Sequence, residues 1–143
     1  MNYGDPSFLA DTVSGYRGIR RPWIGSKTDP LFKKYGYNTG IDVFCDRVYS
    51  YINGVVLAVG SDGAGYYSVT IQYDAISCLR YTRLKSALVN PDDIIQAGFA
   101  IGEVNKYFRF EYITRNKGSS LWSVRVGTET YYKQDPVKMF GVD

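Results

Sequence analysis

The sequence predicts an all-β protein of antiparallel strands that follow an extended N-terminal arm. Fourteen tyrosines and fifteen glycines accompany short runs rich in Val, Ile, Tyr and Thr, and a Gly or Asp cluster closes each run. No long stretch has the apolar period of a helix. The 143 residues are enough for one domain with a single core.

Residues 1–36 form the predicted arm, because glycines and prolines interrupt this segment and no apolar period is sustained. Phe8, Leu9 and Trp23 punctuate it. These large apolar residues are candidates for an interface with a neighbouring subunit. The alternative is that they fix the arm onto its own domain, which is placed at residues 37–143.

Within the domain, side chains alternate between apolar and polar from Tyr67 to Tyr73, which predicts a half-buried strand. Asn53-Gly54 between two apolar runs is typical of a type I′ hairpin. Two further strands are expected over residues 107–114 and 121–126. The helix candidate is short, at residues 90–96.

The net charge and the absence of targeting signals in the sequence argue against several classes of function. A net charge of +3 without a basic stripe argues against nucleic-acid binding. The first ten residues lack the basic and apolar regions of a signal peptide, and no apolar run approaches the ~18 residues of a membrane helix. We therefore expect a chain that is made in the cytoplasm and does not insert into a membrane. Cys45 and Cys78 lack zinc-knuckle spacing and are expected to be buried free thiols.

Six motifs in a fixed order carry the functional prediction. They are Asn38-Thr39-Gly40-Ile41-Asp42, the run Val48–Val56 with Gly63-Ala64-Gly65-Tyr66 and Val69-Thr70-Ile71, Tyr81-Thr82-Arg83-Leu84, Asp92–Gly102, Tyr107-Phe108-Arg109-Phe110-Glu111, and Gln134–Phe140. Their order and spacing resemble the lysostaphin-like zinc metallopeptidases, which are peptidoglycan endopeptidases. The resemblance implies that family's antiparallel β-sheet or sandwich, a duplicated hybrid motif with a long groove.

The resemblance also implies five vestigial active-site positions. In the family, histidine and aspartate zinc ligands stand at the positions of Asn38 and Asp42. A catalytic histidine stands at the position of Arg83. The closing pair of histidines, a general base and the third zinc ligand, correspond to Tyr107 and Arg109. Of these five positions, the sequence keeps the family residue at Asp42 alone.

The chemistry of a zinc peptidase is therefore expected to be lost. A catalytic zinc needs about three protein ligands and an open position for water, yet the chain contains no histidine. A serine or cysteine nucleophile would also lack its usual activating base. An acid–base pair of Asp42 and Glu111 is the remaining alternative, set against a network of salt bridges with nearby arginines. We expect no catalytic residue, no metal and no cofactor.

Loss of the metal would leave Asp42 without a counter-charge, which costs several kcal/mol when a carboxylate is buried. Strand alternation places Tyr107 and Arg109 on the face that the family uses for zinc. We expect a guanidinium nitrogen of Arg109, or else of Arg83, at about 3 Å from the Asp42 carboxylate. Asn38 and Tyr107 should line the same pocket.

These observations favour a non-enzymatic structural protein that keeps the fold as a docking block. A phage tail or baseplate is the expected setting, because active lysostaphin-like domains are common on phage tails. The partners would be other protein subunits, and the chain would lie in the virion if phage-encoded and in the cytoplasm otherwise. Two alternatives stay open: a module that binds peptidoglycan or another glycan along the groove, and a regulator of a cell-wall hydrolase.

Overall fold

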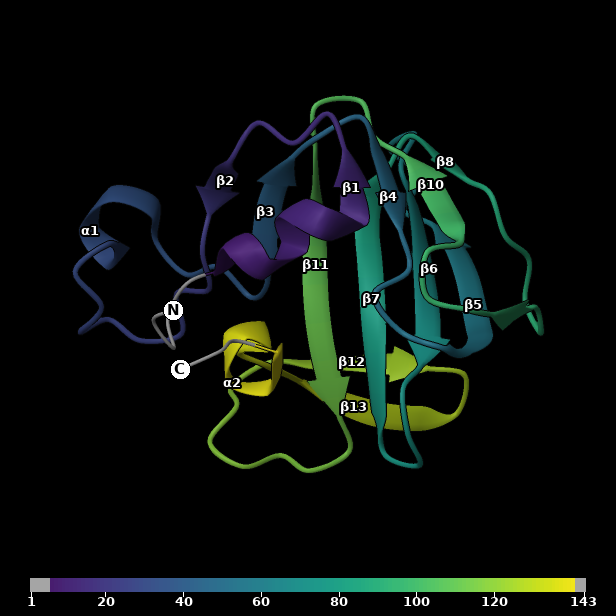
Figure 1. Cartoon of the computed structure of the whole chain (residues 1–143). Coiled ribbons are helices and arrows are strands. Elements are labelled where there is room, and N and C mark those ends of the chain that lie inside the picture. Colours follow the sequence, from purple (N-terminus) through teal and green to yellow (C-terminus); the bar gives the residue numbers. More distant parts are fainter. Residues whose placement is uncertain (1–5, 141–143) are drawn as a thin grey trace.

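Two antiparallel sheets make up most of the structure (Figure 1). The computed structural model describes residues 6–140. The elements, in chain order, are η1 (Pro6–Thr12), β1 (Val13–Ser14), β2 (Ile19–Arg21), α1 (Phe32–Tyr35), β3 (Ile41–Phe44), β4 (Arg47–Tyr49), β5 (Gly54–Ser61), β6 (Tyr67–Gln72), β7 (Ser77–Leu84), β8 (Ser86–Ala87), β9 (Ile94–Ile95), β10 (Ala100–Glu103), β11 (Tyr107–Thr114), β12 (Ser123–Val126), β13 (Glu129–Gln134) and α2 (Pro136–Phe140). The predicted all-β antiparallel fold class is confirmed.

The larger sheet has the strand order β12-β13-β11-β7-β6-β5-β9, with β3 paired to β11 and β2 paired to β3. Strands β11, β7, β6 and β5 run side by side, and the β12–β13 hairpin crosses near one end of them (Figure 1). The smaller sheet has the order β1-β4-β10-β8. Because β5, β6 and β7 pair in succession, these three strands form an antiparallel meander.

The core lies between the two sheets, because alternate side chains of both point toward each other. Phe108 and Phe110 from β11 and Tyr81 from β7 join Val48 and Ile101 of the smaller sheet in one buried cluster. The ring of Tyr81 stacks on Phe108 with centroids 6.0 Å apart. The opposite face of β3, β11 and β7 is polar and holds the candidate site.

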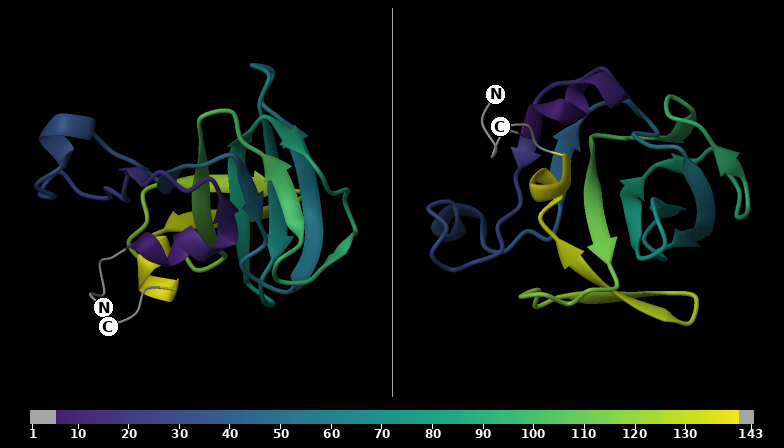
Figure 2. Two further views of the ribbon diagram at one scale, coloured as in Figure 1. Left: turned by 45° about the horizontal axis from the view of Figure 1, so that its top comes forward. Right: turned by 60° about the horizontal axis from the view of Figure 1, so that its bottom comes forward.

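The N-terminal arm is less extended than the sequence predicted. It contains η1, α1 and two short strands, of which β1 pairs with β4 and β2 pairs with β3. Leu9 is 1% exposed and belongs to the core, which corrects its assignment as a possible interface residue. The side chain of Phe8 lies outside the described part. Helix α1 stands apart from both sheets (Figure 2).

The predicted hairpin at Asn53-Gly54 is wrong. Strand β4 belongs to the smaller sheet and β5 to the larger one, so the dipeptide connects two sheets. A Cβ atom at Gly54 would lie 2.2 Å from the carbonyl oxygen of Gln72. The glycine is therefore required by close strand approach, and Asn53 instead accepts a hydrogen bond from the backbone N–H of Ala97 (2.8 Å).

The helix predicted at residues 90–96 is absent. The backbone there bonds to the edge of β5, since Asp92 N–H donates to the Val56 carbonyl and Val56 N–H donates to that of Asp93. This pairing leads directly into β9. The backbone groups that helical hydrogen bonds would need are therefore bonded to β5. The last predicted strand begins at Ser123, two residues later than expected.

Two other expectations concern burial and membranes. Cys45 and Cys78 are buried and form no disulfide, which confirms the prediction of free thiols.

None of the helices within residues 6–140 is long and apolar enough to span a membrane.

Candidate functional site

The polar face of the larger sheet is built by three strands in register. Asp42 on β3 lies opposite Arg109 on β11, and Arg109 in turn lies opposite Thr82 on β7. Two residues further along β11, Glu111 lies opposite Arg80. The period of two along each strand therefore gathers two acidic and two basic side chains on the face turned away from the core.

Asp42 is held by three guanidinium groups. Its side chain is 0% exposed. Arg109 donates from Nε to Oδ1 (2.8 Å) and from Nη2 to Oδ2 (3.4 Å). Arg20 through Nη1 and Arg21 through Nε each donate to Oδ2 at 3.1 Å. The expected ion pair between Arg109 and Asp42 is present, and every oxygen of this carboxylate faces a donor.

The two arginines from the arm are residues that sequence reasoning missed. They reach Asp42 because β2 pairs with β3, with Arg21 opposite Asp42 and a register shift beside it. The available signal was two consecutive arginines in a segment otherwise rich in glycine and proline. A strand of three residues is too short for its apolar–polar alternation to indicate which strand it pairs with.

The electrostatics of Arg109 follow from this packing. Burial lowers the pKa of its guanidinium, but the hydrogen bond and negative charge of Asp42 outweigh burial. The pKa therefore ends above its ordinary value, and Arg109 stays charged throughout the physiological range.

Glu111 forms the second buried centre. Its side chain is 2% exposed, and it pairs with Arg80 and with Lys133, whose Nζ lies 2.9 Å from Oε2. Lys133 also donates to Thr39 Oγ1 (3.4 Å). Asp42 and Glu111 are thus both held in salt bridges, which favours the network over the acid–base pair among the sequence-based alternatives.

Arg83 and Tyr107 form a stack beside Asp42. Two guanidinium carbons lie over the Tyr107 ring, that of Arg83 at 4.0 Å and that of Arg20 at 4.4 Å from the ring centroid. Arg83 also donates to Tyr66 Oη (3.3 Å) and adopts φ = 64°, a conformation that is costly for a residue with a Cβ. Arg83, the alternative partner expected for Asp42, stacks on Tyr107 instead, and Tyr107 borders the Asp42 cluster.

Asn38 fastens the arm to the start of β3. It is 2% exposed, and its Nδ2 donates to the carbonyls of Pro22 and Gly40, each at 2.9 Å. Its Oδ1 has no hydrogen-bond partner within the described residues. Asn38 therefore contacts backbone where the resembled family has a metal ligand.

Positive charge prevails on the polar face. Six cations lie near three carboxylates, the buried Asp42 and Glu111 and the exposed Asp62, which gives a local excess of three positive charges. The cations are Arg20, Arg21, Arg80, Arg83, Arg109 and Lys133. A cavity of about 220 Å³ opens beside Arg80 and Arg83, with Ser68 and Thr82 also in its wall.

Comparison with solved structures identifies the fold. The solution structure of lysostaphin superposes with a TM-score of 0.64 and 18% sequence identity, covering 93% of this chain and 56% of that chain. A zinc-containing peptidase from Vibrio cholerae gives a TM-score of 0.59 and 21% identity over 73% of this chain and 36% of that chain. The chain has the lysostaphin-like peptidase fold.

The lysostaphin-like fold also occurs in an assembly. The structure of the SpoIIQ–SpoIIIAH pore-forming complex matches with a TM-score of 0.62 and 13% identity over 84% of this chain and 81% of that chain. The present chain spans about half the length of lysostaphin and about a third of the Vibrio cholerae peptidase. No family model and no curated protein matches the sequence.

A zinc ion does not fit the residues at this place in the lysostaphin-like fold. Asp42 offers carboxylate oxygens, but guanidinium N–H groups already occupy both. Within residues 6–140, no group of three His, Cys, Asp or Glu side chains could hold a metal. Arg109 and Arg20 would also repel a dication.

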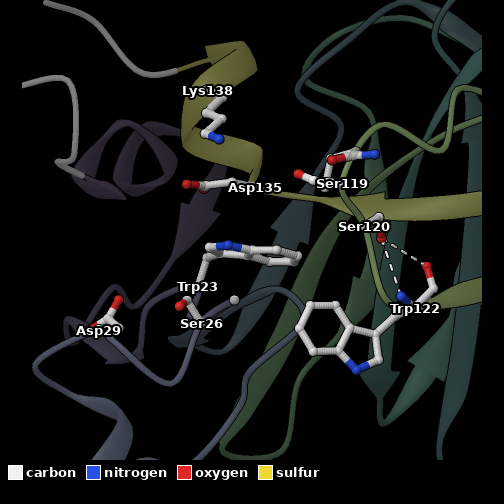
Figure 3. Close-up of a pocket in the computed structure, with 10 residues that line it drawn as sticks. Trp23, Ser26, Asp29, Ser119, Ser120, Trp122, Asp135 and Lys138 are labelled. Atoms are coloured by element: carbon white, nitrogen blue, oxygen red, sulfur yellow. Dashed lines mark hydrogen bonds between the residues drawn. The ribbon is translucent and has the colours of Figure 1, made fainter.

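A second cavity shares no lining residue with the cavity beside Arg80 and Arg83. Its volume is about 250 Å³. The arm contributes Trp23, the β11–β12 connection contributes Trp122, and α2 with the residue before it contributes Lys138 and Asp135 (Figure 3). We call it the tryptophan pocket. Trp23, predicted as an interface residue, is half-buried here.

Proposed function

We propose that this chain is a non-catalytic protein that uses the lysostaphin-like fold as a rigid docking block in a larger assembly. One observation carries the proposal: Asp42 is fully buried and bonded to three guanidinium groups. A carboxylate in this state cannot ligate a metal without losing its ion pairs. The occurrence of the same fold in a pore-forming complex supports a role in assembly.

The charge of the polar face indicates what docks there. Its arginine side chains are partly exposed, from 18% for Arg80 to 35% for Arg20, and they outnumber the carboxylates. An acidic segment of a partner subunit would offset the excess charge and would be steered toward it over a Debye length of about 10 Å. We therefore propose an acidic protein partner for this face.

The setting we propose is a phage tail or baseplate, with the chain in the virion and other structural subunits as its partners. The support is the resemblance, since active members of the family are common on phage tails and a member without histidines would keep the shape. Binding of peptidoglycan along the polar face is the alternative, and cosedimentation with purified cell walls tests it.

Zinc content and hydrolysis test the absence of catalysis. We expect no stoichiometric zinc in the purified chain after dialysis against a zinc buffer. We also expect no soluble fragments from peptidoglycan under conditions in which lysostaphin clears it. Stoichiometric zinc, or release of soluble fragments from peptidoglycan, would overturn the proposal.

Docking is tested with a labelled oligoglutamate peptide as the acidic probe. We expect binding that weakens as salt is raised, and a severalfold loss in Arg83→Gln, which leaves the ion pairs of Asp42 intact. Arg125→Gln is the matched control, because Arg125 is an exposed arginine on β12 that contacts the Thr128 carbonyl. Equal binding by both variants would show that the polar face is not the docking surface.

A further inference from the structure

We infer that the tryptophan pocket is a binding site for a saccharide. Its lining includes none of the residues that form the ion pairs of Asp42 and Glu111, and the inference does not depend on the docking proposal. Both tryptophans of the chain line this one cavity. Concentration of the largest aromatic rings in a partly open, polar cavity is unusual, because such rings normally bury their faces in a core.

The two indoles form fixed walls. Trp23 and Trp122 meet edge to face at 89°, with ring centroids 5.7 Å apart. The ring of Tyr37 also packs against Trp122, with ring centroids 5.2 Å apart. A Cβ atom at Gly25 would lie 2.6 Å from Trp23 Nε1, so the indole rests directly against the backbone of the arm. Because neighbours already hold these rings, binding a ligand would cost little side-chain entropy.

The backbone behind Trp122 is also anchored. Ser120 is 6% exposed, and its Oγ accepts from the Trp122 N–H (3.3 Å) and lies 3.1 Å from the Trp122 carbonyl oxygen, as Figure 3 shows. The same Oγ contacts the Lys133 carbonyl on β13 at 2.6 Å. The loop that presents Trp122 is thereby tied to the larger sheet.

Hydrogen-bonding groups stand around the aromatic walls. Asp29 and Asp135 each use Oδ1 to accept a backbone N–H, from Leu31 at 2.8 Å and from Val137 at 3.0 Å. Within residues 6–140, their Oδ2 atoms have no hydrogen-bond donor, and both residues line the cavity. The exposed Ser119 adds a hydroxyl at the opposite side (Figure 3).

This combination matches the chemistry of a sugar ring. A pyranose has an apolar C–H face, which can lie on an indole, and hydroxyl groups at its rim, which donate to carboxylates. Carboxylates disfavour a nucleic acid, because they repel phosphates. Lys138 in the lining reduces the attraction for an organic cation, which would otherwise compete for the aromatic faces.

Tryptophan fluorescence reports on this cavity through both indoles of the chain, and Trp23 separates it from the neighbouring cavity that Trp122 also borders. The probes are chitotetraose, maltotetraose and cellotetraose, titrated against the full chain. We expect a saturable change in emission with at least one of them and shifts of both indole N–H signals in NMR spectra. Absence of saturation with all three, or saturation by a proline-rich peptide instead, would overturn the inference.

A blocking variant separates binding from folding. Ser119→Arg places a long side chain at the mouth of the tryptophan pocket from an exposed position, and we expect at least a tenfold loss of saccharide affinity. Ser123→Arg is the control, since Ser123 is exposed on β12 outside the pocket. Unchanged affinity in Ser119→Arg would overturn the assignment. Oligoglutamate binding should be the same in both variants, so failure of this site and failure of the docking proposal give different results.

Discussion

Arg21 on β2 lies opposite Asp42 on β3 and donates from Nε to Oδ2 at 3.1 Å. This ion pair joins the N-terminal arm to the strand that carries the one retained ligand position of the resembled zinc site. The arm is therefore part of the site, because it supplies two of the three cations that neutralise Asp42.

Replacement of Asp42 by asparagine should strongly destabilise the fold. The change leaves three partly buried guanidinium groups without their counter-charge, which costs about 3–5 kcal/mol of unfolding free energy. Urea denaturation measures it. Asp46→Asn is the control, because Asp46 pairs with Arg17 on the surface with 64% of its side chain exposed, and the expected loss is under about 1 kcal/mol. Similar losses in both variants would contradict the role given to Asp42.

Zinc binding should return only when the arm arginines are removed. Asn38→His with Arg109→His supplies, together with Asp42, the three ligand types of the resembled site. We expect no zinc in this double variant, because Arg20 and Arg21 still hold Oδ2 of Asp42. Adding Arg20→Ala and Arg21→Ala should give one zinc per chain by elemental analysis. Zinc in the double variant would mean that the arm does not block the ligand.

Gly40→Ala should disturb the site through backbone contact. A Cβ atom there would lie 2.6 Å from the carbonyl oxygen of Phe110 and 2.7 Å from Arg109 Cγ. Because the Phe110 carbonyl belongs to β11 and cannot move freely, we expect a loss of about 1–3 kcal/mol in unfolding free energy. Gly60→Ala is the control, since its nearest neighbour is Ser68 Oγ at 3.1 Å. An equal effect at both glycines would refute the argument from close approach.

The two cysteines should resist alkylation in the native state. Burial raises the pKa of the Cys45 thiol to about 12 and raises that of Cys78 as well. Because the thiolate is the reactive form, iodoacetamide at pH 8 should modify neither residue until denaturant is added. Two equivalents should then react. Rapid reaction of the folded chain would mean that a thiol is exposed.

Stability should depend on pH through Asp135. Burial raises the pKa of this carboxyl, while the Val137 N–H and Lys138 act in the opposite direction. A raised pKa means that the folded state holds the proton more tightly, so stability falls as pH rises from about 4 through the raised pKa. Asp135→Asn removes the charge and can keep the cap of α2. Its gain in stability should be present at pH 8 and vanish below pH 4; a gain independent of pH would contradict this.

Sequence reasoning predicts those parts of the site that depend on local alternation. The strand Tyr107–Thr114 is found with the predicted bounds, because its period of two extends over eight residues. Its register then places Arg109 opposite Asp42. The buried free state of Cys45 and Cys78 also follows from spacing and composition alone.

The remaining features depend on contacts between distant segments. Strand β2 has three residues, so nothing local indicates that it pairs with β3. The role of Gly54 was misassigned because a close approach to Gln72 and a hairpin turn both require glycine. Leu9 is apolar in either setting, and its burial follows from how the arm crosses the core.

The three guanidinium groups around Asp42 have a consequence for how this sequence can evolve. Introducing one histidine would leave the other arginines to repel a dication, so that step alone brings no metal. Removing an arginine first would weaken the neutralisation of a buried carboxylate and lower stability before any metal could compensate. Each single substitution toward a zinc site is therefore unfavourable by itself. The cluster therefore opposes stepwise evolution of a zinc site. Several substitutions would have to occur together before selection for hydrolysis could act.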